Sequence, residues 1–162
     1  MGLEDYAKKR TFEKTPEPAG AKPVTEGQTR GGEFCFQRHR ARRLHYDLRI
    51  EVGGTLKSWA VPQGPSPEAG VKRLAVMVED HPLAYAEFEG TIPKGSYGAG
   101  SVMLWDRGAF DLLGDVAAET QLARGDLKFR LHGEKLNGDF AIVLMKGRGK
   151  GKRGSKSAEA SA

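Results

Sequence analysis

Residues 45–61 read His-Tyr-Asp-Leu-Arg-Ile-Glu-Val-Gly-Gly-Thr-Leu-Lys-Ser-Trp-Ala-Val. Polar and apolar side chains alternate through His45–Val52, a pattern typical of a half-buried β-strand. The pair Gly53-Gly54 is a two-residue hairpin signal, and Thr55–Val61 supplies the returning strand. The segment therefore predicts an antiparallel hairpin whose first strand has one polar face and one apolar face.

Short strand patterns recur on both sides of this hairpin, separated by glycine-rich turns. We predict a mainly β fold: a small closed β-barrel with one or two short helices. A helix is expected at Asp115–Ala123 with Asp115 as its N-cap, and a turn at Asp106-Arg107-Gly108. The other expected strands are Glu33–Gln37, Arg73–Glu79, Ala84–Phe88, Ser101–Trp105, Ala109–Leu113, Asp126–His132 and Asp139–Met145.

The length of 162 residues suits one domain with one hydrophobic core. The sequence has no apolar run long enough for a transmembrane helix, and its N-terminus is too polar for a signal peptide. The single cysteine, Cys35, excludes an intramolecular disulfide and a cysteine-based zinc site, and we expect it to be packed. We expect a cytoplasmic, nucleoid-associated protein with no membrane partner.

Charge is distributed unevenly along the chain, although the formal net charge is only +5. Residues 37–49 carry five arginines and one aspartate, and residues 146–162 carry six basic side chains and one acidic side chain. The latter segment lacks apolar periodicity. We therefore expect an N-terminal arm at 1–32, a β-barrel domain at 33–145 and a disordered basic tail at 146–162. The basic balance favours a polyanionic partner such as nucleic acid.

The first strand of the hairpin carries the candidate site. Because side chains alternate between the faces of a strand, His45, Asp47 and Arg49 share one face. Imidazole and carboxylate groups are good ligands for Mn²⁺ or Zn²⁺, and His39 can supply a third ligand. Arg49 would present its planar set of donors to a bound phosphate. These residue types together indicate metal-assisted phosphoryl transfer.

Other interpretations fit the same residues. The arginines within 38–43 are also typical of a solvated loop, and a His-x-Asp pair is often an ordinary surface pair. His45 and Asp47 with the distant His132 have the form of the 2-His-1-carboxylate triad of Fe(II) oxygenases. A catalytically weak β-barrel that only binds nucleic-acid ends is the non-enzymatic alternative. The glycine-rich segment 93–100 lacks the residue order of a P-loop and is expected to be a tight turn.

Five segments in order resemble the 3′-phosphoesterase domain of bacterial DNA ligase D, the ligase of non-homologous end joining. The resemblance extends from about Tyr6 to Met145 and indicates a stand-alone member without a ligase or polymerase module. It implies a small β-barrel with a crescent-shaped site, in agreement with the strand pattern. The segments are Phe36-Gln37-Arg38-His39, Arg43-Leu44-His45-Tyr46-Asp47-Leu48-Arg49, Leu56-Lys57-Ser58-Trp59-Ala60-Val61-Pro62, Val78-Glu79-Asp80-His81-Pro82-Leu83-Ala84-Tyr85 and Phe88-Glu89-Gly90-Thr91-Ile92-Pro93.

The resemblance implies a manganese-dependent enzyme that heals 3′ ends in DNA repair, with other divalent transition metals as alternatives. Family members remove a terminal 3′-ribonucleoside to leave a 3′-phosphate, and then hydrolyse that phosphate to a hydroxyl. The implied substrates are the 3′ ends of DNA or RNA-containing primer-templates. The implied partners are an end-joining ligase, a polymerase or Ku.

The same resemblance assigns roles to residues. His39, His45 and Asp47 would be the metal ligands, and Arg49 and His81 would contact the scissile phosphate. His81, when protonated, would stabilise the phosphate or act as the acid. The remaining candidates are Tyr85, with a catalytic role, and the substrate-binding or supporting residues Arg10, Glu17, Gln37, Gln63 and Arg73.

Two positions depart from the family pattern. Gln63 stands where the family usually has lysine, so a hydrogen-bond donor replaces a charge and phosphate affinity is expected to be lower. Thr11 stands where the family usually has aspartate in the Arg-Asp-Phe motif, so the diesterase step is expected to be affected more than the monoesterase step.

Removal of the basic tail tests the charge distribution. Deleting residues 146–162 should weaken nucleic-acid binding and reduce its salt dependence more than it slows catalysis, because the tail supplies much of the non-specific attraction. Binding to a labelled primer-template over a salt series measures both effects. An unchanged salt slope would contradict this division of roles.

Overall fold

The computed structural model describes residues 3–10, 12, 16–18, 30–145 and 155–161, the last segment by its backbone. Within these residues, no helix is long and apolar enough to cross a membrane. In chain order the elements are α1 (Leu3–Lys8), β1 (Gly32–Arg40), β2 (Leu44–Val52), β3 (Thr55–Val61), β4 (Lys72–Pro82), the 3-10 helix η1 (Leu83–Glu87), β5 (Gly90–Ile92), β6 (Gly100–Leu112), α2 (Ala118–Arg124), β7 (Asp126–Gly133), β8 (Asn137–Leu144) and β9 (Ser155–Ser161).

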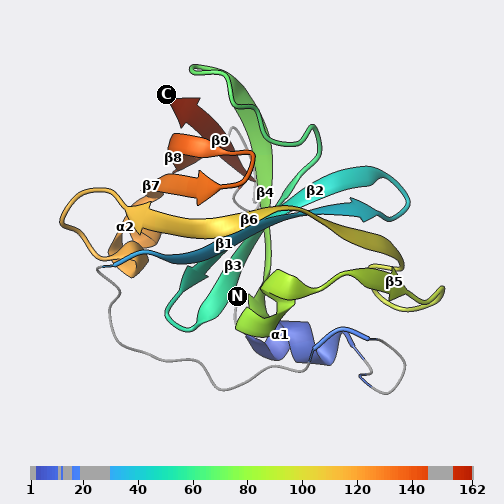
Figure 1. The fold of residues 1–162 in the computed structure, drawn as a ribbon. Coiled ribbons are helices and arrows are strands. Elements are labelled where there is room, and N and C mark those ends of the chain that lie inside the picture. The colour runs from blue at the N-terminus through green and yellow to red at the C-terminus, as the bar shows by residue number, and fades with distance from the viewer. Residues whose placement is uncertain (1–2, 11, 13–15, 19–29, 146–154, 162) are drawn as a thin grey trace.

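The strands form one antiparallel sheet that curls back on itself (Figure 1). The sheet order is β1-β2-β3-β4-β9-β8-β7-β6-β5, and β1 also pairs with β6, which joins the two sides of the sheet. The predicted hairpin forms β2 and β3, with Val52 opposite Thr55 across the two glycines. The prediction of a mainly β barrel is therefore confirmed.

The side chains of β1 alternate between two separate hydrophobic clusters. Phe34 and Phe36 belong to the larger cluster inside the barrel, together with Trp59 and Phe129. Cys35 points to the outer face and belongs to a second cluster, whose other buried members are Tyr6, Leu56, Tyr85, Ala86, Phe88, Ile92 and Val102. The expectation of one core was wrong, because α1 and η1 cover the outer face of the barrel and bury a second apolar layer.

The segment expected as a strand at Ala84–Phe88 is helical instead: η1 covers most of it. Its burial does not alternate as in a strand, because the neighbouring residues Tyr85 and Ala86 are both buried. Tyr85 and Phe88 are both buried with ring centroids 4.9 Å apart, while Glu87 between them is exposed. Pro82 precedes the helix in an extended conformation, with φ −68° and ψ 153°. The 3-10 turn therefore aims two aromatic rings at the outer face of the barrel.

The prediction of a turn at Asp106-Arg107-Gly108 was also wrong, because these residues lie within strand β6. Gly108 is needed for a close approach between strands: a Cβ there would lie 2.0 Å from the carbonyl oxygen of His132 on β7. The Asp106 carboxylate serves a different turn, the one between β7 and β8. It accepts hydrogen bonds from the backbone N–H groups of three residues there, Glu134, Lys135 and Leu136, at 2.8–3.2 Å.

The expected helix at Asp115–Ala123 begins later than its sequence signal, at Ala118 in α2. The residue before it, Ala117, makes no side-chain capping bond, so Asp115 is not the N-cap. The Gln121 side chain donates instead to the carbonyl oxygens of Leu113 and Val116, at 3.0 and 2.9 Å. These bonds hold the preceding segment in an irregular conformation.

The C-terminal segment differs in part from the expected disordered tail. Residues 155–161 lie as β9 between β4 and β8, with Val76 opposite Ser155 and Val143 opposite Ser157. The backbone groups on the facing edges of β4 and β8 find hydrogen-bond partners in this way, which accounts for the placement of a polar segment there. The rest of the predicted tail, 146–154 and 162, lies outside the described residues.

Replacement of the Asp106 carboxylate tests its structural role. We expect Asp106→Ala to destabilise the fold by about 2–4 kcal/mol, because it leaves several N–H groups near the barrel without their acceptor. The stability of Asp106→Asn should lie between those of the unsubstituted chain and Asp106→Ala. Urea denaturation followed by tryptophan fluorescence measures the difference.

The control for this measurement is Asp111→Ala on the same strand. Asp111 is exposed and bonds to the exposed imidazole of His132, so its loss should leave stability nearly unchanged. An Asp106→Ala variant as stable as this control would contradict the assignment.

Candidate metal and phosphate site

The ladder between β1 and β2 assembles the centre of the site. His39 lies directly opposite His45, and Gln37 lies directly opposite Asp47. The Asp47 carboxylate sits between the two imidazoles, with Oδ2 3.5 Å from His39 Nδ1 and Oδ1 3.2 Å from His45 Nε2. Within the described chain, these three residues form a group whose candidate ligand atoms all lie within 4.8 Å of one another. The structure thus brings together the three predicted metal ligands.

Backbone carbonyls fix the orientation of both imidazoles. His39 Nε2 lies 2.7 Å from the Gly98 carbonyl oxygen, and His45 Nδ1 lies 3.2 Å from that of Arg43. A ring N–H donated to each carbonyl leaves His39 Nδ1 and His45 Nε2 as the nitrogens that face the carboxylate. Both nitrogens of each ring face a hydrogen-bond acceptor. Each ring can therefore carry two N–H groups as an imidazolium, or keep the N–H that faces the carbonyl and bind a cation through the nitrogen that faces Asp47. This donor set fits a divalent metal ion.

The electrostatics of Asp47 favour its ionised form. Burial alone would raise its pKa, but hydrogen bonds from His39 and His45 and the charge of Arg49 outweigh burial and hold the pKa well below the usual range. The pKa of His45 is raised, chiefly by its hydrogen bond to Asp47. A negative carboxylate therefore stands between two nitrogens that bind either protons or a metal.

Arg49 lies beside Asp47 with its side chain only 4% exposed. Its Nε donates to Gln37 Oε1 at 2.7 Å, and Nη2 lies 3.5 Å from Asp47 Oδ2. The guanidinium also lies 4.7 Å from the ring centroid of Tyr85. Its Nη1 has no hydrogen-bond partner among the described residues. A buried guanidinium with an unused donor beside a candidate metal-binding group is suited to an anionic ligand.

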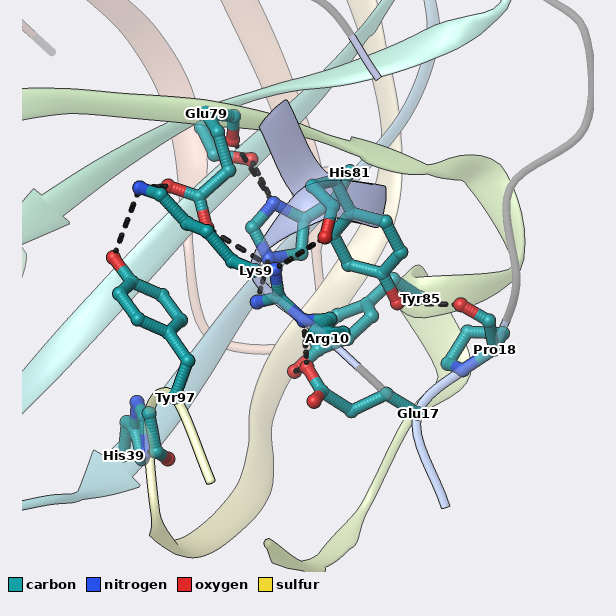
Figure 2. A network of polar contacts seen from close by, with 12 residues as sticks. Lys9, Arg10, Glu17, Pro18, His39, Glu79, His81, Tyr85 and Tyr97 are labelled. Atoms are coloured by element: carbon teal, nitrogen blue, oxygen red, sulfur yellow. Dashed lines mark hydrogen bonds and ion pairs between the residues drawn. The ribbon is translucent and has the colours of Figure 1, made fainter. Parts of the chain in front are cut away.

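The N-terminal arm contributes a second buried arginine (Figure 2). Arg10 Nε donates to Glu17 Oε2 at 2.8 Å, Nη1 lies 3.3 Å from Glu79 Oε1, and Nη2 lies 3.2 Å from His81 Nε2. The Tyr85 hydroxyl donates to the same Glu17 oxygen at 2.7 Å. Arm residues 10 and 17 thus lie beside Tyr85 and His81.

His81 is held in the neutral form. Burial, followed by the charges of Arg49 and Arg10, places its pKa well below the usual value. Its Nδ1 lies 2.9 Å from the Glu79 carbonyl oxygen, which fixes the proton there and leaves Nε2 to accept from Arg10. The resting site therefore offers a neutral imidazole at this position, unlike the protonated acid considered from the sequence.

These residues surround a pocket of about 150 Å³ on the outer face of the barrel. Its lining includes Arg10, His39, His45, Asp47, Arg49, Glu79, His81, Tyr85 and Tyr97. Gln37 lies behind it and donates to the carbonyl oxygens of Tyr85 and Phe88, at 2.7 and 3.0 Å, which ties η1 to β1.

Two of the residues that the resemblance assigns to substrate binding or support, Gln63 and Arg73, lie outside this pocket. Gln63 and Arg73 bond to each other at 2.8 Å, but neither lines this pocket; Arg73 lines a separate apolar cavity with Phe36 and Phe129. Thr11 lies outside the described residues.

The geometry disfavours the Fe(II) oxygenase interpretation. The third ligand in that interpretation, His132, lies on β7, where its Nε2 is 2.7 Å from Asp111. His39 occupies the third position beside His45 and Asp47 instead. The described residues therefore supply a different triad from the one that this interpretation requires.

Comparisons with known proteins agree with the site. Residues 37–144 match the family model described as the DNA Ligase D 3′-phosphoesterase domain. The chain belongs to this family. It is 55% identical over 148 residues to the multifunctional non-homologous end joining protein LigD of Pseudomonas aeruginosa, covering 91% of this chain and 17% of that protein. It is 44% identical over 146 residues to the LigD DNA repair protein of Mycobacterium tuberculosis, covering 90% and 18%.

A third relative, LigD of Mycolicibacterium smegmatis, is 40% identical over 150 residues, covering 90% of this chain and 19% of that protein. The chain thus spans less than a fifth of the length of each of these relatives. Membership of the phosphoesterase family agrees with the resemblance stated from the sequence motifs. The names of the relatives state a role in non-homologous end joining for those proteins.

Sequence reasoning did not identify the contribution of three pocket residues. Glu79 lies 3.3 Å from both Lys9 and Arg10 and so fixes the arm to β4. The Tyr97 hydroxyl accepts from Lys9 at 3.3 Å, and Gly98 orients His39. Gly98 has φ +75°, a conformation that favours glycine. The glycine-rich composition of 93–100 was the available signal, but composition alone indicated only a turn.

Metal affinity should depend on pH in this family member. Below its raised pKa, His45 carries a proton at Nε2 that a cation must displace, so affinity should fall as the solution becomes more acidic. We expect up to about tenfold weaker binding per pH unit below that pKa for one displaced proton. Isothermal titration with Mn²⁺, in buffers of different ionisation enthalpy, measures the affinity and counts the protons released. Affinity independent of pH would contradict this protonation scheme.

Proposed function

We propose that the chain is a divalent-metal-dependent phosphoesterase that heals nucleic-acid 3′ ends, with Mn²⁺ as its metal. The observation that carries this proposal is the unpartnered Nη1 of buried Arg49 beside the His39, His45 and Asp47 group. A phosphate is the anion that uses both features, because its oxygens accept from a guanidinium and also bind a metal ion. Family membership supports the same chemistry.

The protein groups have separate roles in this proposal. His39, His45 and Asp47 would hold the cation, which when bound would stabilise charge developing on the phosphate oxygens. Arg49 would bind a second oxygen, while Gln37 and the Tyr85 ring hold its guanidinium in place. Burial of these groups limits competition from water, which strengthens their electrostatic effect.

His81 Nε2 is positioned to accept a hydrogen bond or a proton. In the resting site this nitrogen accepts from Arg10, so Arg10 competes with any substrate group for the hydrogen bond to His81 Nε2. A neutral His81 has no proton to donate at Nε2, and protonation of the leaving oxygen therefore requires water or a change in the protonation state of His81.

The two proposed activities would use the arm differently. Arg10 lines the pocket, and the fully buried Glu17 holds its guanidinium through a 2.8 Å bond. We assign them to the removal of a terminal 3′-ribonucleoside, and the metal-binding group with Arg49 to both steps. Gln63 and Arg73 would act outside the pocket, on a more distant part of the substrate.

The proposed setting is the repair of broken DNA in the cytoplasm, at the nucleoid. The substrates would be primer-templates with a 3′-ribonucleotide or a 3′-phosphate. An end-joining ligase, a polymerase or Ku would be the partners, since the named relatives are multifunctional end-joining proteins.

Substitution of a metal-binding residue tests the proposed activity. His45→Ala and Asp47→Ala should each lower both activities by more than about a hundredfold, because removal even of groups that only orient metal ligands costs about 10–100-fold. The assay uses a 3′-ribonucleotide primer-template with Mn²⁺ and resolves the 3′-phosphate and 3′-hydroxyl products.

His132→Ala is the matched control, since it removes the imidazole of another His–Asp pair that does not line the pocket. It should retain full activity. An unsubstituted chain that binds the primer-template but releases neither product would favour the binding-only alternative and overturn the proposal. Undiminished activity in His45→Ala would show that the chemistry lies elsewhere.

A further inference from the structure

The turn between β1 and β2 exposes an unusual set of arginines. Arg40, Arg42 and Arg43 are exposed, and none of them has an ion-pair or hydrogen-bond partner through its side chain among the described residues. Two other arginines are paired: the half-exposed Arg107 lies 3.5 Å from Glu87, and the exposed Arg130 lies 2.6 Å from Asp139. Three positive charges without a paired carboxylate among the described residues thus gather at one turn.

This turn is continuous with the pocket. Ala41 lines the pocket, and the carbonyl oxygen of Arg43 orients His45. The side chains of Arg42 and Arg43 therefore begin at the pocket edge, on the backbone that carries two metal-binding residues. Figure 1 shows the turn at the outer end of the β1–β2 hairpin, away from β7 and β8. A ligand that extends out of the pocket on this side would meet these guanidinium groups.

The local charge favours a polyanion at this position. Residues 37–49 contain five arginines, and the one carboxylate among them, Asp47, is already engaged by two histidines and Arg49. Like charges held close together repel one another unless counterions or an anionic ligand neutralise them. A nucleic-acid strand supplies a row of phosphates that can do so, with release of its own counterions.

We infer that Arg42 and Arg43 bind phosphodiester groups of the strand whose 3′ end enters the pocket. This inference rests on the proposed function, because it takes the pocket as the site of the terminal phosphate. The pocket holds that one phosphate, and the turn holds phosphates further along the backbone. The contact is to the backbone and carries no base specificity, so it suits an enzyme that must accept ends of any sequence.

Salt dependence of binding tests this contact. The probe is a labelled DNA primer-template with a 3′-hydroxyl end, and the protein is the full 162-residue chain without added metal, so that binding is measured without turnover. Two lost phosphate contacts should reduce the slope of log affinity against log salt by about 1.4 to 1.8 in Arg42→Gln/Arg43→Gln. From 50 to 200 mM salt the unsubstituted chain should therefore lose about tenfold more affinity than the variant. Arg42→Lys/Arg43→Lys should restore most of the slope.

The matched control is Arg124→Gln/Lys128→Gln on α2 and β7, which removes the same charge from residues that do not line the site pocket. Its slope should stay close to that of the unsubstituted chain. Equal slopes in the two double variants, or an unsubstituted chain with no salt-dependent binding, would overturn the inference. Because the measurement needs no catalysis, its failure is separate from that of the proposed function, which would appear as absence of product.

A kinetic comparison separates a backbone contact from damage to the pocket. Arg42→Gln/Arg43→Gln should raise KM more for a 3′-phosphorylated oligonucleotide than for a nucleoside 3′-monophosphate, because the smaller substrate has no further phosphates. An equal increase in both KM values would place the effect in the pocket and contradict the inferred contact.

Discussion

The site depends on the placement of one carboxylate, Asp47, between two imidazoles whose outer nitrogens bond to backbone carbonyls. Antiparallel pairing of β1 and β2 places His39 opposite His45. The loop that contains Gly98 supplies one carbonyl and the β1–β2 turn supplies the other. With the outer positions fixed, the two inner nitrogens and the carboxylate can exchange protons for a cation without moving the backbone. The barrel thus provides a rigid support for a preorganised candidate metal site.

The second hydrophobic cluster explains why this site lies on the outside of a barrel and is still buried. α1 and η1 cover the outer face of the sheet, and Tyr6 and Tyr85 pack against His81 with ring centroids 4.8 and 4.6 Å away. Arg10 enters the pocket from this layer and bonds to groups from the arm and from β4. The apolar layer therefore positions the arm and also lowers the local dielectric around the charged groups.

The sequence was most informative where structure repeats over short distances. Alternation in β2 correctly placed His45, Asp47 and Arg49 on one face, and the motifs identified the family. Alternation could not show that Asp106 serves a turn thirty residues later, or that Gln121 replaces Asp115 in holding the start of α2. The bonds from His39 to Gly98 and from Arg10 to Glu79 likewise join segments about sixty and seventy residues apart. Such contacts depend on how strands far apart in the chain are brought together.

Crystals grown with Mn²⁺ and measured at the manganese absorption edge would test the central claim most directly. The account predicts an anomalous-difference peak bonded to His39 Nδ1, His45 Nε2 and an Asp47 carboxylate oxygen, with His39 Nε2 still bonded to the Gly98 carbonyl. A fully occupied peak at other residues, or ligation through His39 Nε2 with the Gly98 bond broken, would contradict it.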